Sequence, residues 1–261
     1  MILTEIAYAK INLALHVRKR RTDGYHDLET VFAFCADGDV LSAELAQSTS
    51  LSIDGPFGSD LSATDNLVIK AAQAIGISAR LTLTKNLPVA SGIGGGSADA
   101  AATLRALSLL SPSSRDIPAI ATKLGADMLA CLLSQTMRGE GVGERLAPEA
   151  SVAGMPVLLV NPRISLSTAS VFKLWDGKDR GALGDWRTGR NDLEAPARSI
   201  VPEIGDLLDW LIGRQGVTVS RMSGSGATCF ALFANHLDCA LASAEVVRAF
   251  PGYWTMETVL R

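Results

Sequence analysis

The sequence lacks the patterns that mark several classes of protein. Its 261 residues hold only four cysteines and no C-x-x-C pair, which argues against a zinc knuckle or a disulfide framework and fits a reducing compartment. No apolar run reaches the roughly 18 residues that a membrane helix needs. The N-terminus also lacks the basic start of a signal peptide. We therefore expect a cytoplasmic protein that does not act at a membrane, with its cysteines as small core residues.

A strong charge of either sign is also missing. The formal net charge is −3, so the chain as a whole shows no sign of binding nucleic acid or acidic membranes. The one basic run, residues 17–21, is interpreted as a solvated loop after a strand. Hydrophobic residues make up 48% and charged residues 20%, which is typical of soluble globular proteins and allows one large domain or two ordinary ones.

Two common nucleotide-binding fingerprints are absent as well. No Gly-Lys-Ser/Thr sequence is present for a Walker loop, and G-x-G-x-x-G fails because Ser97 stands where its last glycine belongs. The stretch LPVASGIGGGSADAA, residues 87–101, nevertheless places four glycines between a strand and a helix. Glycines let backbone N–H groups converge, and a helix N-terminus attracts anions. This pattern predicts a nucleotide loop of another kind, with a triphosphate as its ligand; a hinge or a tight packing site is the alternative.

A second short glycine segment places Gly224 and Gly226 between serines at the start of a buried strand. A bulge or a tight turn would explain it equally well if it stood alone. Together with the first loop it suggests that two small-residue loops close on one phosphate chain.

Hydrophobic periodicity predicts a mixture of helices and strands. The N-terminal strand places Ile11, Leu13, Leu15 and Val17 on one face, as expected of a half-buried strand. Its other face carries Lys10, Asn12, Ala14 and His16. His16 is interpreted as an ordinary residue of that face. Turns are predicted at 23–26 and 37–39, strands at 28–34 and 39–45, and helices at 65–76, 97–110, 114–125, 201–216 and 237–250. This order is α+β, with two compact halves at 1–152 and 153–261.

The glycine stretch resembles the phosphate loop of the GHMP kinases, and MSGSGATCFALF at 222–233 resembles their third motif. Several further segments are similar to the 4-diphosphocytidyl-2-C-methyl-D-erythritol kinases, a branch of that family: AKINLALHVRKRRTDGYHDLETVF at 9–32, LGAD at 124–127, GEGVGERLAP at 139–148, STASVF at 167–172 and NDLE at 191–194. The resemblance runs in order along essentially the whole chain. It implies a two-domain GHMP kinase fold with the active site in the cleft between the domains.

The resemblance also implies an activity. It indicates ATP-dependent phosphorylation of the 2-hydroxyl of 4-diphosphocytidyl-2-C-methyl-D-erythritol, in the non-mevalonate route to isoprenoid precursors. Lys10 and Asp127 match the catalytic pair, in which Asp127 would take the proton of the acceptor hydroxyl. Lys10 would keep that carboxylate ionised and neutralise charge in the transferring group. Mg²⁺ would arrive with ATP, since it prefers phosphate oxygens and water with few protein ligands.

Binding residues follow from the same resemblance. Asn66 and Lys85 match positions near the adenine, and the remaining ATP contacts would come from the loop itself: Pro88, Val89, Ala90, Ser91, Gly92, Ile93, Gly94, Gly95, Gly96, Ser97 and Ala98. The substrate would be bound by Asn12, Tyr25, His26, Thr168 and Phe172, with the aromatic rings stacking on the cytosine. The oligomeric state is expected to be a monomer or a homodimer.

Ordinary roles compete with each of these assignments. A lysine on the polar face of a strand is usually solvated, and an aspartate after Gly-Ala is most often a cap or turn residue. Asp99, in the first turn of its helix, is interpreted as compensating the helix dipole. Two alternative functions stay open: a GHMP kinase for another small alcohol, and a non-catalytic nucleotide-binding protein. Lys10 and Asp127 argue against the second, because binding alone needs no base.

Overall fold

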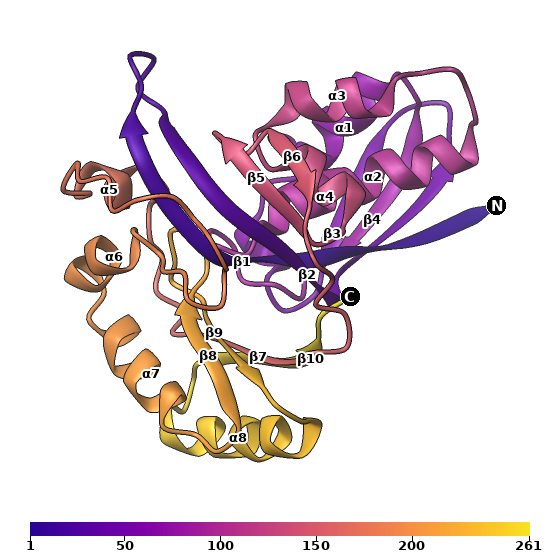
Figure 1. Ribbon diagram of the computed structural model, residues 1–261. Coiled ribbons are helices and arrows are strands. Elements are labelled where there is room, and N and C mark those ends of the chain that lie inside the picture. The colour runs from indigo at the N-terminus through magenta and orange to yellow at the C-terminus, as the bar shows by residue number, and fades with distance from the viewer. The chain divides into compact units, whose positions relative to one another are not determined.

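The computed structural model describes all of residues 1–261 and divides into two compact units that interleave along the chain. The long strands β1 (Ile2–Arg20) and β2 (His26–Leu45), the indigo pair in Figure 1, each run through both units. The sequence predicted a single domain boundary at 152/153. The two units instead each consist of three separate segments, because both long strands are shared. Unit 1 comprises residues 1–10, 37–89 and 94–134; unit 2 comprises residues 11–36, 90–93 and 135–261.

In unit 1 the second half of β2 pairs antiparallel with β4 (Ala79–Thr84), which pairs in parallel with β3 (Ser50–Asp54). An alanine-rich helix, α2 (Gly95–Leu110), is buried along most of its length. Its small side chains let it pack closely against α1 (Leu67–Ile75) and α4 (Met128–Leu133). The unit is completed by a short 3₁₀ helix at Gly58–Asp60 and by α3 (Ile117–Leu124).

In unit 2 the first half of β2 pairs with β5 (Met137–Gly141), which pairs with β6 (Arg145–Pro148). A separate antiparallel sheet has the order β10-β7-β9-β8, with bounds Trp254–Val259, Pro156–Asn161, Cys229–Phe233 and Val217–Met222. The helices α7 (Glu203–Ile212) and α8 (His236–Ala249) pack against this sheet. Two shorter helices complete the unit, α5 (Thr168–Lys173) and α6 (Glu194–Ile200).

Some local predictions are confirmed. The turn at 23–26 separates β1 from β2, and the helix predicted at 65–76 is α1. Asn66 caps α1 by accepting a hydrogen bond from the Val68 N–H at 2.9 Å, and Gly76 ends it with a φ of 70°. All four cysteines are buried. None of the helices is long and apolar enough to cross a membrane.

Two predictions about the first two strands were wrong: a turn at 37–39 and the half-burial of the N-terminal strand. The turn expected at 37–39 does not form, because β2 continues through it. Gly38 is there for close packing, since a Cβ at this position would collide with the backbone of Ala7 and Tyr8. The N-terminal strand was expected to be half-buried, but residues 9–17 are buried on both faces.

Candidate active site

Lys10 and Asp127 lie together in unit 1. The Lys10 Nζ is 3.0 Å from Asp127 Oδ2; the lysine side chain is 5% exposed and that of Asp127 35% exposed. The start of α2 lies against the same lysine, since a Cβ on Gly94 would come within 2.9 Å of Lys10 Cε. A buried ammonium thus contacts a carboxylate that solvent, or a substrate, can still reach. This geometry suits a general base that is oriented by a neighbouring cation.

The backbone holds Asp127 without occupying its carboxylate. Asp127 stands at the N-cap position of α4, and its carbonyl accepts the Cys131 N–H at 3.0 Å. Its side chain makes no capping bond. Met128, the first residue of α4, is fully buried and fixes the start of the helix. The main chain therefore positions Asp127 while leaving its carboxylate available for Lys10.

The N-terminus of α2 has the properties of an anion site. This 16-residue helix begins after Gly94, whose φ is 67°, and no side chain caps it. The neighbouring helices α1 and α3 are capped by Asn66 and Asp116. Uncapped N–H groups of a first turn need acceptors, and the helix dipole favours negative ones. The residues present therefore fit a phosphate group.

The two glycine segments meet in unit 2. The Ser223 hydroxyl donates to the Gly92 carbonyl at 2.9 Å and accepts from the Asn12 N–H at 3.2 Å. A Cβ on Gly224 would lie 2.8 Å from the Gly92 oxygen, so the backbones approach too closely for a side chain there. The Thr228 N–H donates to the Ser91 carbonyl at 3.1 Å. The structure thus brings together the two loops that the sequence singled out separately.

Sequence reasoning missed the residue that holds the second loop. The Asn191 Nδ2 donates to the carbonyls of Met222 and Gly224, both at 2.8 Å, and its Oδ1 accepts the Leu193 N–H at 2.9 Å. The next residue, Asp192, accepts the Val17 N–H of β1 at 2.9 Å. The NDLE segment therefore joins β1 to the glycine loop. Its presence among the family-like motifs was the available signal, but no role had been assigned to it.

An aromatic cluster in unit 2 includes two of the predicted substrate residues. His26 stacks on Phe172 with ring centroids 4.7 Å apart, and Trp175 meets the His26 ring edge-on at 5.5 Å. Burial, and next the charge of Arg20, lower the pKa of His26, so its ring is neutral at pH 7. Tyr25 is 64% exposed. Trp175 was not foreseen as a site residue; its place three residues after the family-like STASVF at 167–172 was the only hint.

The polar substrate candidates are held by hydrogen bonds within unit 2. The Asn12 Nδ2 donates to the Thr30 hydroxyl at 2.8 Å, and Thr30 donates to the Ala14 carbonyl at 2.6 Å. The Thr168 hydroxyl lies 2.8 Å from the hydroxyl of Ser225, in the second glycine loop. Asn12, through its N–H, and Thr168, through its hydroxyl, therefore both contact serines of the second glycine loop.

The two residues expected near the adenine use their side chains inside unit 1. Asn66 caps α1 and also donates to the Ser62 carbonyl at 3.2 Å. The Lys85 Nζ lies 2.5 Å from Asp39 Oδ2 and 2.7 Å from Asp99 Oδ2. Asp99 is thus part of a buried ion cluster, a role beyond the compensation of a helix dipole that the sequence suggested. A contact of either side chain with adenine stays a prediction.

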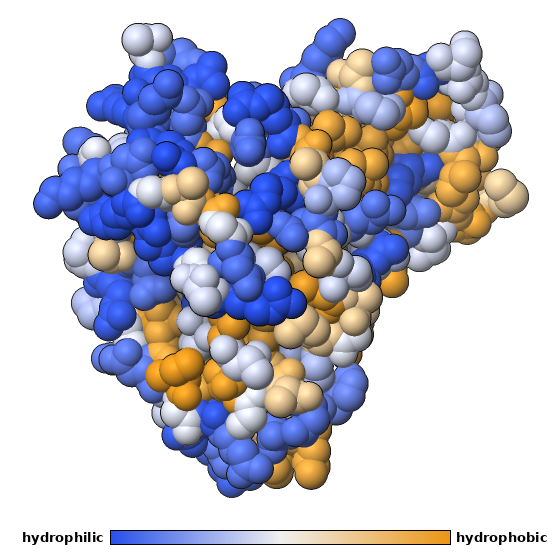
Figure 2. All heavy atoms as spheres, viewed as in Figure 1, coloured by the Kyte–Doolittle hydropathy of each residue, from blue (hydrophilic) through white to orange (hydrophobic).

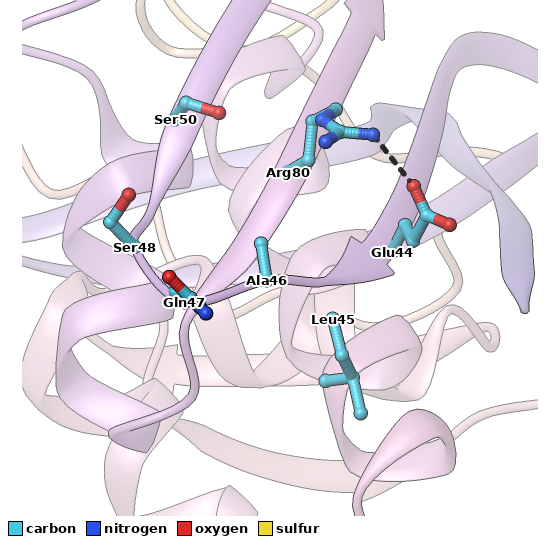
Figure 3. Close-up of a pocket in the computed structure, with 7 residues that line it drawn as sticks. All are labelled: Glu44, Leu45, Ala46, Gln47, Ser48, Ser50 and Arg80. Atoms are coloured by element: carbon cyan, nitrogen blue, oxygen red, sulfur yellow. Dashed lines mark hydrogen bonds and ion pairs between the residues drawn. The ribbon is translucent and has the colours of Figure 1, made fainter.

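An open pocket in unit 1 contains no predicted site residue. Figure 3 shows its lining, in which Glu44 and Arg80 form an ion pair at 2.9 Å. The other lining residues are Leu45, Ala46, Gln47, Ser48 and Ser50. Its only cation is already paired, so the pocket offers little to a ligand. No group of three histidine, cysteine or acidic side chains that could hold a metal ion is present.

Comparison with known proteins places this geometry in a family. The family model described as "GHMP kinases N terminal domain" matches residues 66–135, and "GHMP kinases C terminal" matches residues 172–252. The chain is 51% identical to the 4-diphosphocytidyl-2-C-methyl-D-erythritol kinase of Novosphingobium aromaticivorans, covering 100% of this chain and 94% of that protein. It is 49% identical to the protein of the same name from Rhizorhabdus wittichii, covering 99% and 94%.

Solved structures agree with these matches. A crystal structure of 4-(cytidine 5'-diphospho)-2C-methyl-D-erythritol kinase superposes with a TM-score of 0.84 at 33% identity and 99% coverage of both chains. A homoserine kinase from Cytophaga hutchinsonii superposes with a TM-score of 0.72 at 15% identity, covering 97% and 95%. The second likeness concerns the fold alone. The predicted α+β GHMP kinase fold is confirmed.

Proposed function

Because the chain belongs to the GHMP kinases and, within them, to the 4-diphosphocytidyl-2-C-methyl-D-erythritol kinases, we propose that it phosphorylates the 2-hydroxyl of that compound. ATP is the phosphoryl donor, and the products are the 2-phosphate and ADP. The reaction is a step of the non-mevalonate route to isoprenoid precursors. The observation that carries the proposal is the contact between Lys10 and Asp127, since a protein that only binds nucleotide needs no such pair.

In the proposed mechanism Asp127 is the base. Its partly exposed carboxylate takes the proton that the acceptor hydroxyl loses as its oxygen bonds to the γ-phosphorus of ATP. Lys10, 3.0 Å away, orients the carboxylate and balances negative charge on the transferring group. Phosphoryl transfer depends mainly on positioning and electrostatics of this kind. General base catalysis typically contributes about 10²–10⁴-fold.

We assign the phosphates of ATP to the uncapped N-terminus of α2 and to the glycine loop that precedes it. Mg²⁺ neutralises phosphate charge in such reactions and prefers phosphate oxygens and water. We expect the ion to arrive with ATP. Cytoplasmic location and a monomeric or homodimeric state stay predictions from the sequence.

We assign the cytosine to the aromatic cluster of His26, Phe172 and Trp175. Stacking of a base on an aromatic side chain is worth about 1–3 kcal/mol in comparable sites. The neutral His26 ring has one nitrogen that donates and one that accepts, which suits a base with a defined hydrogen-bonding edge. Tyr25, Asn12 and Thr168 stay candidates for further contacts with the substrate.

A substrate panel tests the proposal. ADP release is measured with 4-diphosphocytidyl-2-C-methyl-D-erythritol, mevalonate, homoserine and galactose, each with ATP and Mg²⁺. We expect turnover with the first compound. Turnover of another alcohol without turnover of the first would instead favour a different GHMP kinase. ATP binding without turnover of any compound, including the first, would favour a protein that only binds nucleotide.

A further inference from the structure

Three charged side chains form a closed cluster inside unit 1. The Lys85 ammonium contacts one oxygen of Asp39 at 2.5 Å and one oxygen of Asp99 at 2.7 Å. All three residues are at most 2% exposed. One positive charge cannot neutralise two buried carboxylates, so the cluster carries an excess negative charge when both are ionised. Burying an unbalanced charge is costly, and proteins usually avoid it by binding a proton.

The cluster contacts the chain on both sides of the glycine loop. Asp39 Oδ1 accepts the N–H groups of Asn86 and Leu87, at 2.6 and 2.8 Å, where the chain leaves β4. Asp99 stands in the first turns of α2, beyond the glycines. A Cβ on Gly95 would come within 2.9 Å of the Lys85 Nζ, so the ammonium lies directly beneath the start of the helix.

The two carboxylates differ in how well they are satisfied. Asp39 accepts hydrogen bonds from the Lys85 ammonium and from two backbone N–H groups. The Oδ2 of Asp99 accepts a hydrogen bond from Lys85, and its buried Oδ1 has no hydrogen-bond partner. An unsatisfied buried oxygen is unfavourable for a carboxylate. Asp99 is therefore the less well satisfied of the two carboxyl groups.

We propose that Asp99 is a positioning residue of the phosphate site, which ties the start of α2 to Lys85 and binds a proton when nucleotide phosphates arrive. The inference rests on the proposed assignment of ATP to this helix N-terminus. The phosphates bring several negative charges near a cluster that already has one too many. Protonation of Asp99 removes that excess, so the cluster no longer repels the phosphates.

The charged groups around Asp99 are consistent with this assignment. Burial raises the pKa of Asp99 to about 7, with Lys85 opposing the shift and Asp39 adding to it. Burial acts to lower the pKa of Lys85, but the Asp99 and Asp39 carboxylates outweigh it and the pKa is raised. On α4 the thiol of Cys131 is neutral, because burial raises its pKa to about 12.

The remaining charged groups on the elements packed around α2 are engaged elsewhere or exposed. Lys70 of α1 pairs with Asp65 at 2.7 Å, and Arg105 of α2 itself pairs with Glu5 at 2.8 Å. Lys123 of α3 is exposed, and Lys10 contacts Asp127. Lys85 and Asp39 are thus the groups that set the charge of Asp99.

The sign of the effect follows from linkage. If nucleotide binding takes up a proton, the association constant falls as the pH rises above the pKa of the free protein. For one proton the limit is about tenfold per pH unit. The Asp99→Asn variant resembles the protonated form and keeps the size of the side chain. At pH 8 it should bind nucleotide several-fold more tightly than the natural chain.

Calorimetry tests the proposal on the full chain. Binding of Mg²⁺ with a non-hydrolysable ATP analogue is measured at pH 7 in buffers of different ionisation enthalpy, which yields the number of protons taken up. The difference between the natural chain and Asp99→Asn cancels the protons of the ligand itself. We expect a larger uptake in the natural chain. Asp116→Asn is the matched control, because Asp116 is an exposed cap that asparagine replaces well, and its uptake should be unchanged.

The possible results separate the role of Asp99 from the proposed function. Binding with equal proton uptake in the natural chain and Asp99→Asn overturns the role of Asp99 and leaves the proposed function intact. Absence of nucleotide binding to the natural chain overturns both. If Asp99→Asn does not fold, the ¹³C chemical shift of the Asp99 carboxyl carbon in the natural chain replaces it. That shift must report a higher pKa with nucleotide than without, and an unchanged pKa contradicts the proposal.

Discussion

The two units use different kinds of interaction at their candidate functional residues. Unit 1 relies on charge, with Lys10 beside Asp127 and Lys85 between Asp39 and Asp99. Unit 2 relies on neutral groups, which are the amide of Asn191 on two carbonyls and the stacked rings of His26 and Phe172. Phosphoryl transfer requires charged side chains that stabilise the negative charge of the transferring group. A nucleobase, in contrast, is recognised by stacking and hydrogen bonds. The difference suggests that unit 1 serves the transfer and unit 2 the recognition of the acceptor.

The largest expected effect tests the charged unit. Asp127→Asn removes the proposed base but keeps its shape, so kcat should fall by about 10²–10⁴-fold while ATP still binds. Steady-state kinetics and nucleotide titration measure the two quantities separately. Asp116→Asn, an exposed substitution in the same unit, should leave both unchanged. An unchanged kcat in Asp127→Asn would show that this residue is not the base. The contrast between the two units would then lose its main support.

A second substitution tests the hydrogen bonds of unit 2. Asn191→Asp places a carboxylate against the carbonyls of Met222 and Gly224, which cannot become donors. Buried groups left unpaired cost about 1–3 kcal/mol each, so the free energy of unfolding should fall by several kcal/mol. Chemical denaturation measures it.

Asn161 provides the matched control for that experiment. It is also buried, but its Nδ2 donates to the hydroxyl of Thr228 at 2.8 Å. The Thr228 hydroxyl can rotate and donate its hydrogen to a carboxylate. Asn161→Asp should therefore lower the free energy of unfolding clearly less than Asn191→Asp. Equal losses at both positions would mean that the partner of the amide does not decide the cost.

The aromatic cluster should affect the acceptor substrate alone. Phe172→Ala and His26→Ala each remove one ring of the stacked pair, so KM for the cytidine substrate should rise by about 5–150-fold, equivalent to 1–3 kcal/mol of stacking. KM for ATP should stay constant. A rise in both KM values would show that the cluster supports the fold more than it recognises a base.

The smallest expected effect is a pH dependence of stability at His16. Its Nδ1 donates to the Gly181 carbonyl at 3.1 Å and its Nε2 accepts the Arg190 N–H at 3.3 Å, so the ring is neutral. Burial lowers the pKa of His16 below 6.5, and the folded state therefore binds a proton less readily than the unfolded state. Stability from this residue is present above pH 6.5 and is lost as the pH falls toward the lowered value. Denaturation of His16→Gln between pH 5 and 7 should show a shallower loss than the natural chain; an identical slope would contradict this role.

Much of the fold and the site was predictable because short segments carry their own signals. Asn66 and Gly76 bound a helix through a cap and a left-handed residue, and a glycine run before alanines indicates an anion site at a helix start. The motif set around Lys10 and Asp127 led to the family, and the two residues are in contact. The continuous β2 was not predictable, since Gly38 and Asp39 are turn-forming residues whose partners come from distant segments.

By itself, the sequence determined the family and located the glycine loop and the candidate pair of Lys10 and Asp127, because these depend on residue types at fixed spacing. Only the tertiary structure decided that Lys85 contacts both Asp39 and Asp99, that Asn191 holds the second glycine loop, and that His26 contacts both Phe172 and Trp175. Each of these contacts joins residues far apart in the chain. Burial then sets their charge and hydrogen bonding, and burial is a property of the folded chain as a whole.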